Sequence, residues 1–245
     1  MSRLFAGTSG FAYPTWKPDF YPAKLAAAKF LSYYSTRLNS VEANFTFRRL
    51  APAKVLEGWI AQTPEEFTFA PKAHQTITHF QRLKNPDDFS QAFLRSLTPL
   101  QTAGRLAPIL FQLPPNFKAD TTLLSEFLST VPKNIRCSFE FRNASWLADP
   151  VYTILQDNGV ALCMAESEKM ETPSVITAPF VYLRLRKPDY SPEEREAHRQ
   201  SIERWLAEGK DVYCYFKHEE DPAGALYAEE LLRNHGNQIK REAGV

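Results

Sequence analysis

Residues 137–142 read Cys137-Ser138-Phe139-Glu140-Phe141-Arg142, and this short stretch decides the fold class. Apolar and polar side chains alternate along it, which is typical of a β-strand with two different faces. The apolar set is suited to packing against helices, whereas the polar set ends on Glu140 and Arg142. A buried strand that ends on charge is typical of a parallel α/β sheet whose functional site lies at the carboxyl ends of its strands.

Seven further apolar runs have the same character, at residues 4–9, 41–44, 67–72, 109–112, 161–166, 181–186 and 212–218. Eight strands separated by helix-length segments predict a single (β/α)8 TIM barrel that occupies residues 1–245. The chain has 245 residues, close to the roughly 250 that this fold typically needs. No linker, repeat or low-complexity segment divides it.

Helices are expected at residues 25–38, 53–62, 87–100, 123–131, 150–158, 191–208 and 224–236. The helix at 191–208 has the clearest limits, because Ser191-Pro192 is a start signal and Gly209 a stop signal. Asn85-Pro86 is a capping signal for the helix at 87–100. Between residues 166 and 180, Pro173 and Pro179 leave room for about one turn. The sixth βα unit is therefore expected to lack a full helix.

The alternation of side chains predicts where the polar residues point. In each strand the apolar set should face the helices, so the charged set should face the barrel axis near its open end. Burial of an unpaired charge in an apolar interior costs on the order of several kcal/mol. These groups must therefore pair with one another or reach water. The predicted ring comprises Glu42, Asn44, Lys72, Gln112, Glu140, Arg142, Glu166, Arg184, Arg186 and Lys217.

This ring has more cations than acids, which favours a pocket for a small anionic or sugar-like ligand. Glu42 and Glu140 are the candidate acid and base, and Lys72 is a third candidate catalytic residue. Lys72 also belongs with the groups that would hold an anion or stabilise negative charge. The candidate substrate-binding residues are Tyr13, Trp16, Asn44, His79, Gln112, Arg142, Trp146, Arg184, Tyr190 and Lys217. An enzyme of unknown specificity is the first hypothesis.

The aromatic members of this set follow the first, fifth and seventh strands. Tyr13, Trp16, Trp146 and Tyr190 are expected to stack on a ligand or to close over it. The alternative is a hydrophobic lid that packs on its own barrel. For the charged ring the corresponding alternative is a network of salt bridges that plugs the barrel.

Two other functions stay open. A non-catalytic nucleotide or nucleic-acid binding module would use the same aromatic and basic residues, although a net charge of +1 gives it no whole-molecule field. Metal-assisted hydrolysis of phosphoesters would need His74, His79 and His218 to converge with the glutamates, and their spacing forms no helical ligand pair. No metal site is assigned and no cofactor is implied, although a divalent metal remains an option.

Composition limits the compartment. Cys137, Cys163 and Cys214 lie inside predicted strands with no metal or redox spacing, which is typical of small buried side chains. Met1 is followed within a few residues by the first strand, and no apolar stretch approaches 18 residues. We expect a cytoplasmic protein without a membrane partner.

The chain also resembles a known family, the domain of unknown function family 72. The resemblance rests on motifs in the same order over nearly the whole chain. They are Gly7-Thr-Ser-Gly-Phe-Ala-Tyr with Trp16 and Phe20-Tyr-Pro, Val41-Glu-Ala-Asn-Phe, Trp59, Thr63-Pro-Glu-Glu-Phe-Thr-Phe-Ala-Pro-Lys72, Thr78-His79, Leu110-Phe-Gln-Leu-Pro-Pro115, Phe139-Glu-Phe-Arg-Asn with Trp146, Tyr182-Leu-Arg-Leu, Tyr190 and Ala225. The resemblance implies a fold similar to TIM barrels and supplies no reaction.

The chain departs from the family pattern at two places. Many members resemble Arg-Leu-His-Gly after the seventh strand, where this chain has Arg184-Leu-Arg-Lys187. Many have Phe-Asn-Asn after the eighth strand, where this chain has Phe216-Lys-His218. Both changes add cationic or titratable groups at the expected site, so its ligand is expected to differ in detail from that of other members.

Overall fold

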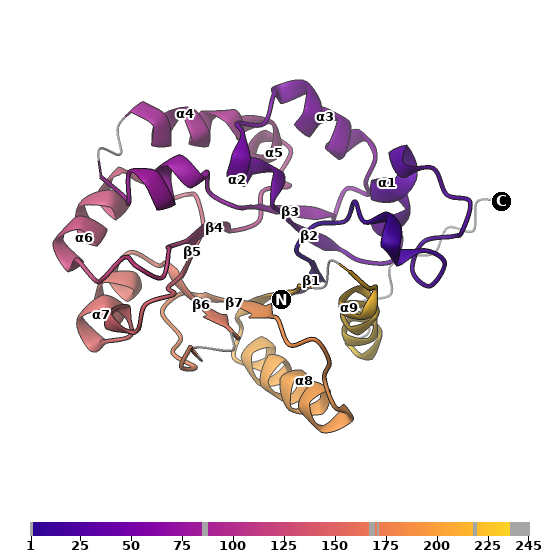
Figure 1. Cartoon of the computed structure of the whole chain (residues 1–245). Helices are drawn as coiled ribbons and strands as arrows, with labels where there is room; N and C mark the ends of the chain where they lie inside the picture. Colours follow the sequence, from indigo (N-terminus) through magenta and orange to yellow (C-terminus); the bar gives the residue numbers. More distant parts are fainter. Residues whose placement is uncertain (1, 85–87, 167–169, 171, 218–219, 236–245) are drawn as a thin grey trace.

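A computed structural model describes residues 2–84, 88–166, 170, 172–217 and 220–235. All eight expected strands are present, each within about two residues of its predicted limits. They are β1 (Leu4–Thr8), β2 (Ser40–Ala43), β3 (Thr68–Pro71), β4 (Ile109–Gln112), β5 (Cys137–Glu140), β6 (Ala161–Ala165), β7 (Phe180–Leu185) and β8 (Asp211–Phe216). Figure 1 shows these strands at the centre of the molecule with the helices around them.

The strands form an α/β fold with two parallel sheets. Six strands pair in the order β1-β8-β7-β6-β5-β4 and curl into a half-barrel, and β2 pairs with β3. The longest register runs from Phe180 opposite Asp211 to Leu185 opposite Phe216. A closed ladder of eight strands was expected from the sequence, but continuous pairing stops between β1 and β2 and between β3 and β4. Only isolated bridges occur there, for example Ser9 with Glu42 and Lys72 with Leu110.

Side chains take the place of a ladder between β1 and β2. The amide of Asn39 accepts from Ala6 N–H at 2.8 Å and donates to the carbonyl of Leu4 at 2.8 Å. The Tyr34 hydroxyl accepts from Thr8 N–H at 2.8 Å and donates to the Ser40 carbonyl at 3.0 Å. The backbone groups of β1 are therefore satisfied without regular strand pairing.

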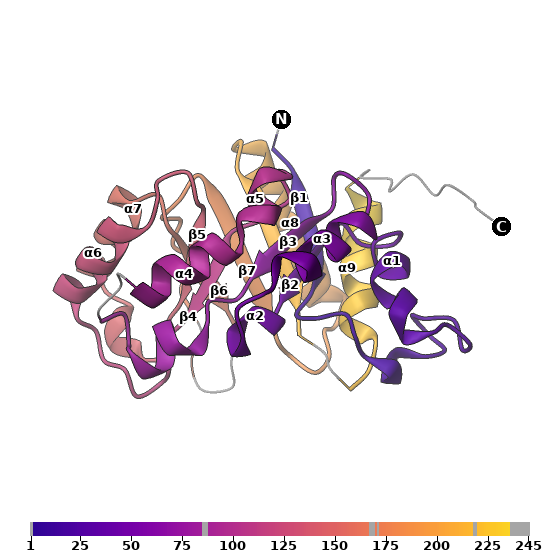
Figure 2. The same cartoon turned by 90° about the horizontal axis from the view of Figure 1, so that it is seen from above.

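The helices lie outside the strands in both views (Figures 1 and 2). They are η1 (Pro14–Trp16), η2 (Ala27–Lys29), α1 (Phe30–Tyr34), α2 (Phe45–Arg48), α3 (Ala53–Ala61), η3 (Thr76–Phe80), α4 (Asp88–Ser96), α5 (Thr98–Thr102), α6 (Thr121–Thr130), η4 (Ala144–Trp146), α7 (Asp149–Asp157), α8 (Pro192–Ala207) and α9 (Ala223–Asn234). In α8 the expected capping box is present, with Ser191 and Glu194 bonded reciprocally.

Two expected helices are divided. Residues 25–38 form the short η2 and α1, and after α1 the chain turns at residues 35–39, which places Asn39 beside β1. Residues 87–100 form α4 and then α5, because Pro99 lacks an N–H and starts a new helix. Asn85 and Pro86, the expected cap, and Gly236, the expected end of the last helix, lie outside the described residues.

The loops after β1, β2, β3 and β5 contain the short elements η1, α2, η3 and η4, which the sequence pattern did not predict. Each has five residues or fewer, too short to show a 3.6-residue period. After β6, the described residues 170 and 172–179 contain no helix, as expected for the sixth unit.

The expected division of strand residues between two faces is confirmed. Val181, Leu183 and Leu185 of β7 belong to the large core between strands and helices, whereas Tyr182 belongs to a second cluster on the inner face. That inner cluster includes Phe5, which stacks on Tyr213 with ring centroids 4.6 Å apart. Aromatic rings thus fill the amino-terminal part of the inner face, and the polar residues lie toward the carboxyl ends.

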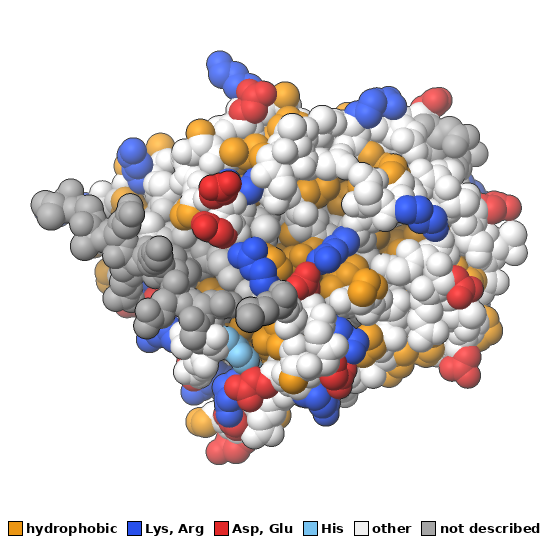
Figure 3. Space-filling model, turned by 180° about the vertical axis from the view of Figure 1, so that it is seen from behind, with side chains coloured by type: hydrophobic (Ala, Val, Ile, Leu, Met, Phe, Trp, Pro, Cys, Tyr) orange, Lys and Arg blue, Asp and Glu red, His pale blue; other side chains and the backbone are white. Residues whose placement is uncertain are grey.

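The outer surface carries charges of both signs. On the face shown in Figure 3, acidic and basic side chains are scattered over the surface, near its centre as well as at its edges, in keeping with a net charge of +1. The three cysteines are buried and free. Within the described residues, no helix has both the length and the apolar character needed to cross a membrane.

Gly7 tests the contact between β1 and β2. A Cβ atom at Gly7 would lie 1.9 Å from the Ser40 carbonyl oxygen, a backbone atom that cannot move aside cheaply. We expect Gly7→Ala to lower the free energy of unfolding by about 1–3 kcal/mol, as overpacking does. Urea denaturation measures this change.

Gly58 provides the matched control, because it lies in α3 and a Cβ there meets nothing within 4 Å. Gly58→Ala should stabilise the protein by about 0.5–1 kcal/mol. Equal effects of the two substitutions would contradict the close approach of β1 to β2.

Candidate functional site

A buried arginine forms the centre of the polar cluster on the inner face. Arg184, on β7, is 1% exposed, and its guanidinium lies between two buried carboxylates. One nitrogen donates to Glu42 Oε1 at 2.6 Å, and another donates to Glu140 Oε2. Glu42 lies on β2 and Glu140 on β5, so one side chain connects three strands of two different sheets.

Glu42 has additional neutral partners. The Ser9 hydroxyl donates to Glu42 Oε1 at 2.7 Å, and the Tyr182 hydroxyl donates to Oε2 at 2.9 Å. Burial alone raises the pKa of Glu42, but the charge of Arg184 and the hydrogen bonds from Arg184 and Ser9 outweigh it, so the pKa is lowered. Glu42 is therefore ionised at neutral pH.

Glu140 is connected to Lys72 through an amide. Gln112 Nε2 donates to both oxygens of Glu140, at 2.8 and 2.9 Å, and Gln112 Oε1 accepts from Lys72 Nζ at 2.9 Å. Burial raises the pKa of Glu140, but the charges of Arg184 and Arg186 and these bonds lower it to about 2. Glu140 is also ionised at neutral pH.

These environments bear on the expected acid and base. A general acid needs a raised pKa, and a carboxylate with a pKa of about 2 is a weak base. Both glutamates are also buried and bonded to Arg184, which leaves them little access to a substrate. The role of Glu42 and Glu140 as acid and base stays a prediction that this geometry does not favour; their evident role is to hold Arg184.

Lys72 has the reverse character. It follows β3, its side chain is half-buried, and its ammonium lies 4.2 Å from the centre of the Phe47 ring. Burial and the charge of Arg184 lower the pKa of Lys72 to about 8, against the opposite effect of Glu42 and Glu140. Within the described residues Lys72 makes no direct ion pair. Its charge therefore changes near pH 8, whereas Glu42, Glu140 and Arg184 stay charged at neutral pH.

More positive charge surrounds Lys72. Arg186 follows β7, keeps 16% of its side chain exposed and lies 3.5 Å from Glu140 Oε1. Arg142 is exposed, and no ion pair to a described residue is found for it. His79 packs edge-on against Phe47, and its pKa is lowered by burial and by the charges of Lys72 and Arg142. The two central carboxylates therefore face a larger number of cations.

His79 comes from an unusual backbone segment. It lies in η3, a single π-helical turn, and Arg82 and Leu83 directly beyond have φ values of +50° and +65°. Non-glycine residues rarely adopt this conformation, and π-turns and strained backbone both occur preferentially at functional sites.

Two predicted polar residues lie at the edge of the cluster. Asn44 is half-buried at the start of α2, and its side chain does not cap that helix. Lys217 directly follows β8, where its N–H donates to the Leu185 carbonyl at 2.9 Å. Within the described residues, the hydrogen bonds and ion pairs of the Arg184 side chain go to Glu42, Glu140 and Ser9.

The aromatic residues correct the sequence-based expectation. Trp16 and Trp146 are 0% exposed and Tyr190 is 1% exposed, so their faces offer no surface on which a ligand could stack. Trp146 packs flat on Phe141 with ring centroids 4.8 Å apart. Tyr13 retains some exposure and lies beside Trp16. Aromatic loop residues carry no periodicity, so sequence alone did not separate core from ligand contacts.

Glu166 belongs to a separate group behind the cluster. It accepts from the Tyr190 hydroxyl and from Arg186 N–H at 3.3 Å, and its other oxygen lies 3.5 Å from His198 Nε2. It therefore fixes the segment after β7 that carries Arg186, rather than facing Arg184.

Three contributors to the cluster were missed from the candidate list. Ser9 and Tyr182 both bond to Glu42, and Phe47 packs against Lys72. The alternation of β7 places Tyr182 on the same face as Arg184, so parity was a usable signal for it. Ser9 ends the expected strand at residues 4–9 with the same parity as Phe5, so parity was a usable signal for it too, whereas Phe47 lies in the short α2, where parity gives no information.

The cluster offers no recognisable metal-binding set. Among the described residues, no three histidine, cysteine, aspartate or glutamate side chains come together. His218, one of the histidines considered for metal binding, lies outside the described residues. The metal-assisted alternative therefore has no donor set in the part of the chain that the structure describes.

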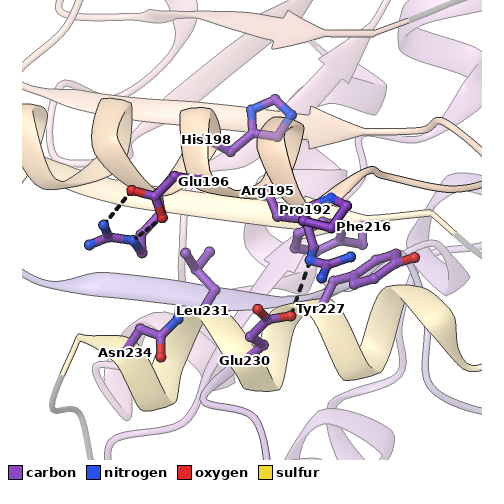
Figure 4. Close-up of a pocket in the computed structure, with 10 residues that line it drawn as sticks. Pro192, Arg195, Glu196, His198, Phe216, Tyr227, Glu230, Leu231 and Asn234 are labelled. Carbon is purple, nitrogen blue, oxygen red and sulfur yellow. Dashed lines mark hydrogen bonds and ion pairs between the residues drawn. The ribbon is translucent and has the colours of Figure 1, made fainter.

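A groove on the outer surface is a different feature. It lies between α8 and α9 and encloses about 140 Å³ (Figure 4). Its charges are paired with one another, Arg195 with Glu230 and Arg199 with Glu196. Each arginine and glutamate that lines it thus has a partner among the described residues, in contrast to the inner cluster.

These features define a parallel α/β protein with a buried ionic cluster at the carboxyl ends of its strands. The model of the family described as "Protein of unknown function DUF72" matches residues 5–243, and the chain belongs to this family. The UPF0759 protein YunF of Bacillus subtilis (strain 168) is 38% identical over 140 residues, 55% of this chain and 50% of that protein. The match thus spans about half the length of the curated relatives.

Solved structures give the same fold. A DUF72 family protein (TM1631) from Thermotoga maritima MSB8 matches with a TM-score of 0.85 and 24% identity, over 95% of this chain and 99% of that chain. An AP endonuclease, family 2, from Brucella melitensis matches with a TM-score of 0.56 and 11% identity, over 96% of this chain and 99% of that chain. At such identities the likeness concerns the fold alone.

Arg184→Met tests the central ion pairs. Removal of the guanidinium leaves two buried carboxylates without their main partner, so we expect a loss of about 3–5 kcal/mol in unfolding free energy at pH 7. Arg95→Met, an exposed position on α4, is the control and should change stability by less than about 0.5 kcal/mol.

The pH dependence should reverse in this variant. In the native protein the lowered pKa of Glu140 contributes stability above the ordinary value of 4.5, and this contribution is lost as the pH falls toward about 2. Without Arg184, burial raises both pKa values, so the variant should gain stability as the pH is lowered from 7 to 5. Urea unfolding at both pH values measures the change; an equal loss at both would contradict the ionised pair.

Proposed function

We propose that this protein is an enzyme that acts on a small anionic substrate at the carboxyl ends of its strands. The observation that carries the proposal is the half-buried Lys72, with a pKa of about 8, beside cations that the two carboxylates do not neutralise. Catalytic groups commonly have pKa values moved toward the working pH. A salt-bridge network with a purely structural role would need no such group.

The proposal assigns different roles to the charged residues. Glu42 and Glu140 fix Arg184 in place, and Arg186 and Arg142 bind the anion from the solvent side. Guanidinium groups suit this task because they donate two parallel hydrogen bonds to a carboxylate or phosphate. Lys72 attracts the anion as an ammonium below its pKa and is available as a base or nucleophile above it. His79 and Gln112 border the same space.

We also propose that the two sheets close into one eight-stranded (β/α)8 barrel. The bridges between Ser9 and Glu42 and between Lys72 and Leu110 lie at the two positions where closure is needed. Active sites of such barrels lie at the carboxyl ends of the strands, where the cluster is found. Likeness of fold to an AP endonuclease supports the architecture and carries no substrate to this chain.

Anion binding provides the test. Titration calorimetry at pH 7 should show that inorganic phosphate and pyruvate bind to the native protein. Their affinity for Arg186→Gln should be roughly ten- to a hundredfold lower, because a charge-assisted hydrogen bond contributes about 1.5–3 kcal/mol. Binding should also weaken as the pH rises through about 8, because Lys72 loses its proton. In Lys72→Met this pH dependence should disappear.

Arg95→Gln is the control and should bind as the native protein does, because Arg95 lies on α4 away from the cluster. Absence of binding, or binding that Arg186→Gln leaves unchanged, would overturn the proposal. Binding of oligonucleotides that falls steeply with salt, with no binding of the small anions, would favour the nucleic-acid alternative instead.

A further inference from the structure

We propose that Lys72 forms an imine with a small carbonyl compound that also carries a carboxylate or a phosphate. The inference rests on the proposed function and names the substrate class for the same site. It is drawn from how the lysine is held, what its nitrogen touches and which charges surround it.

The lysine is fixed along its whole length. Its N–H donates to the Ala43 carbonyl at 3.2 Å, and its carbonyl accepts from the Thr46 hydroxyl at 2.7 Å. The side-chain nitrogen lies 4.2 Å from the centre of the Phe47 ring and 2.9 Å from Gln112 Oε1. A nucleophile held at both ends approaches an electrophile in one geometry, which is a large part of what covalent catalysis requires.

The nitrogen is kept away from the nearby carboxylates. Glu42 and Glu140 are bonded directly to Arg184, and the amide of Gln112 stands between Glu140 and the amine. The partner of the lysine is thus a neutral oxygen, which does not hold a proton on the amine as a carboxylate would. Buried lysines beside other cations are the usual form of an amine that reacts with carbonyl groups.

The charged groups around Lys72 come from several elements. Arg184 of β7 and Arg186 after it favour the neutral amine, whereas Glu42 of β2 and Glu140 of β5 favour the ammonium, with burial added to the first pair. His79 of η3 is a further neighbour, since Lys72 lowers its pKa. The balance leaves Lys72 with a pKa of about 8. At pH 7 the fraction of Lys72 that is the neutral amine is therefore roughly 300-fold larger than the neutral fraction of an ordinary lysine.

The reaction needs no component beyond the amine and the carbonyl compound. The nitrogen lone pair forms a bond to the carbonyl carbon, and the oxygen takes up a proton as the nitrogen loses one. The resulting hydroxyl then leaves as water with the second amine proton, which gives a carbon–nitrogen double bond. Arg186 lies beside this space with an Nε that has no partner among the described residues, and it is the group that would hold the anionic end.

Reductive trapping tests the inference. The full chain is incubated at pH 8 with pyruvate and sodium cyanoborohydride, and intact mass followed by peptide mapping locates the reduced adduct. We expect the adduct at Lys72 at least roughly tenfold above that at any other lysine, because more of this amine is neutral. Acetone, a neutral carbonyl compound of similar size, should label Lys72 much more slowly because it lacks the anionic group.

Three variants sharpen the result. Lys72→Arg keeps the charge and should abolish the specific adduct, while Lys133→Arg, in the turn after α6, should leave it unchanged. Arg186→Gln should reduce labelling by pyruvate to about the rate seen with acetone. Labelling spread over surface lysines, or unchanged in Lys72→Arg, would overturn the imine.

The two proposals fail in different ways. If phosphate and pyruvate bind in an Arg186-dependent manner but cyanoborohydride traps nothing at Lys72, the imine is excluded and the anion site remains. If neither anion binds and acetone labels Lys72 as fast as pyruvate does, the anion site is excluded, and with it the substrate class proposed here.

Discussion

The ion pairs of Arg184 are the interaction on which the rest of the structure depends. They join β7 in the six-stranded sheet to β2 in the two-stranded sheet, across an inner face where regular strand pairing is interrupted. Buried ion pairs add little stability compared with apolar packing, but they penalise every arrangement in which one partner is left alone. Here that penalty favours one arrangement of the two sheets. Tyr182 of β7 and Ser9 after β1 add hydrogen bonds to Glu42 that favour the same arrangement.

The same interaction decides which groups are free for chemistry. Because both glutamates are bonded to Arg184, they are poorly placed to exchange protons with a ligand, and the reactive group that we propose is Lys72 instead. The aromatic layer of Phe5, Tyr213 and Tyr215 fills the inner face below. The cluster thus borders buried rings on one side, while Lys72 and Arg186 keep part of their side chains exposed on the other. Electrostatic interactions are stronger in such buried surroundings than in water.

Much of this arrangement could be predicted from the sequence. The alternation of apolar and polar residues at 137–142 predicts β5, its two faces and the inward position of Glu140. The same pattern in β7 predicts that Arg184 lies on the inner face. What could not be predicted depends on contacts between distant segments. The burial of Trp16 and Trp146 follows from loop packing, and the lowered pKa of Lys72 follows from its burial and from the nearby charge of Arg184. Neither leaves a local pattern.

Gln112 shows how narrow the chemical basis of this site is. Its amide nitrogen donates to Glu140, and its amide oxygen accepts from Lys72. The amide therefore separates the negative charge of the carboxylate from the amine. A carboxylate at the same position would accept the proton of the lysine and make it an ordinary salt-bridge partner. For the imine chemistry that we propose, a single side-chain amide thus decides whether this fold displays a reactive nitrogen or an inert one, and the chemistry of the site can change in evolution without any change in its architecture.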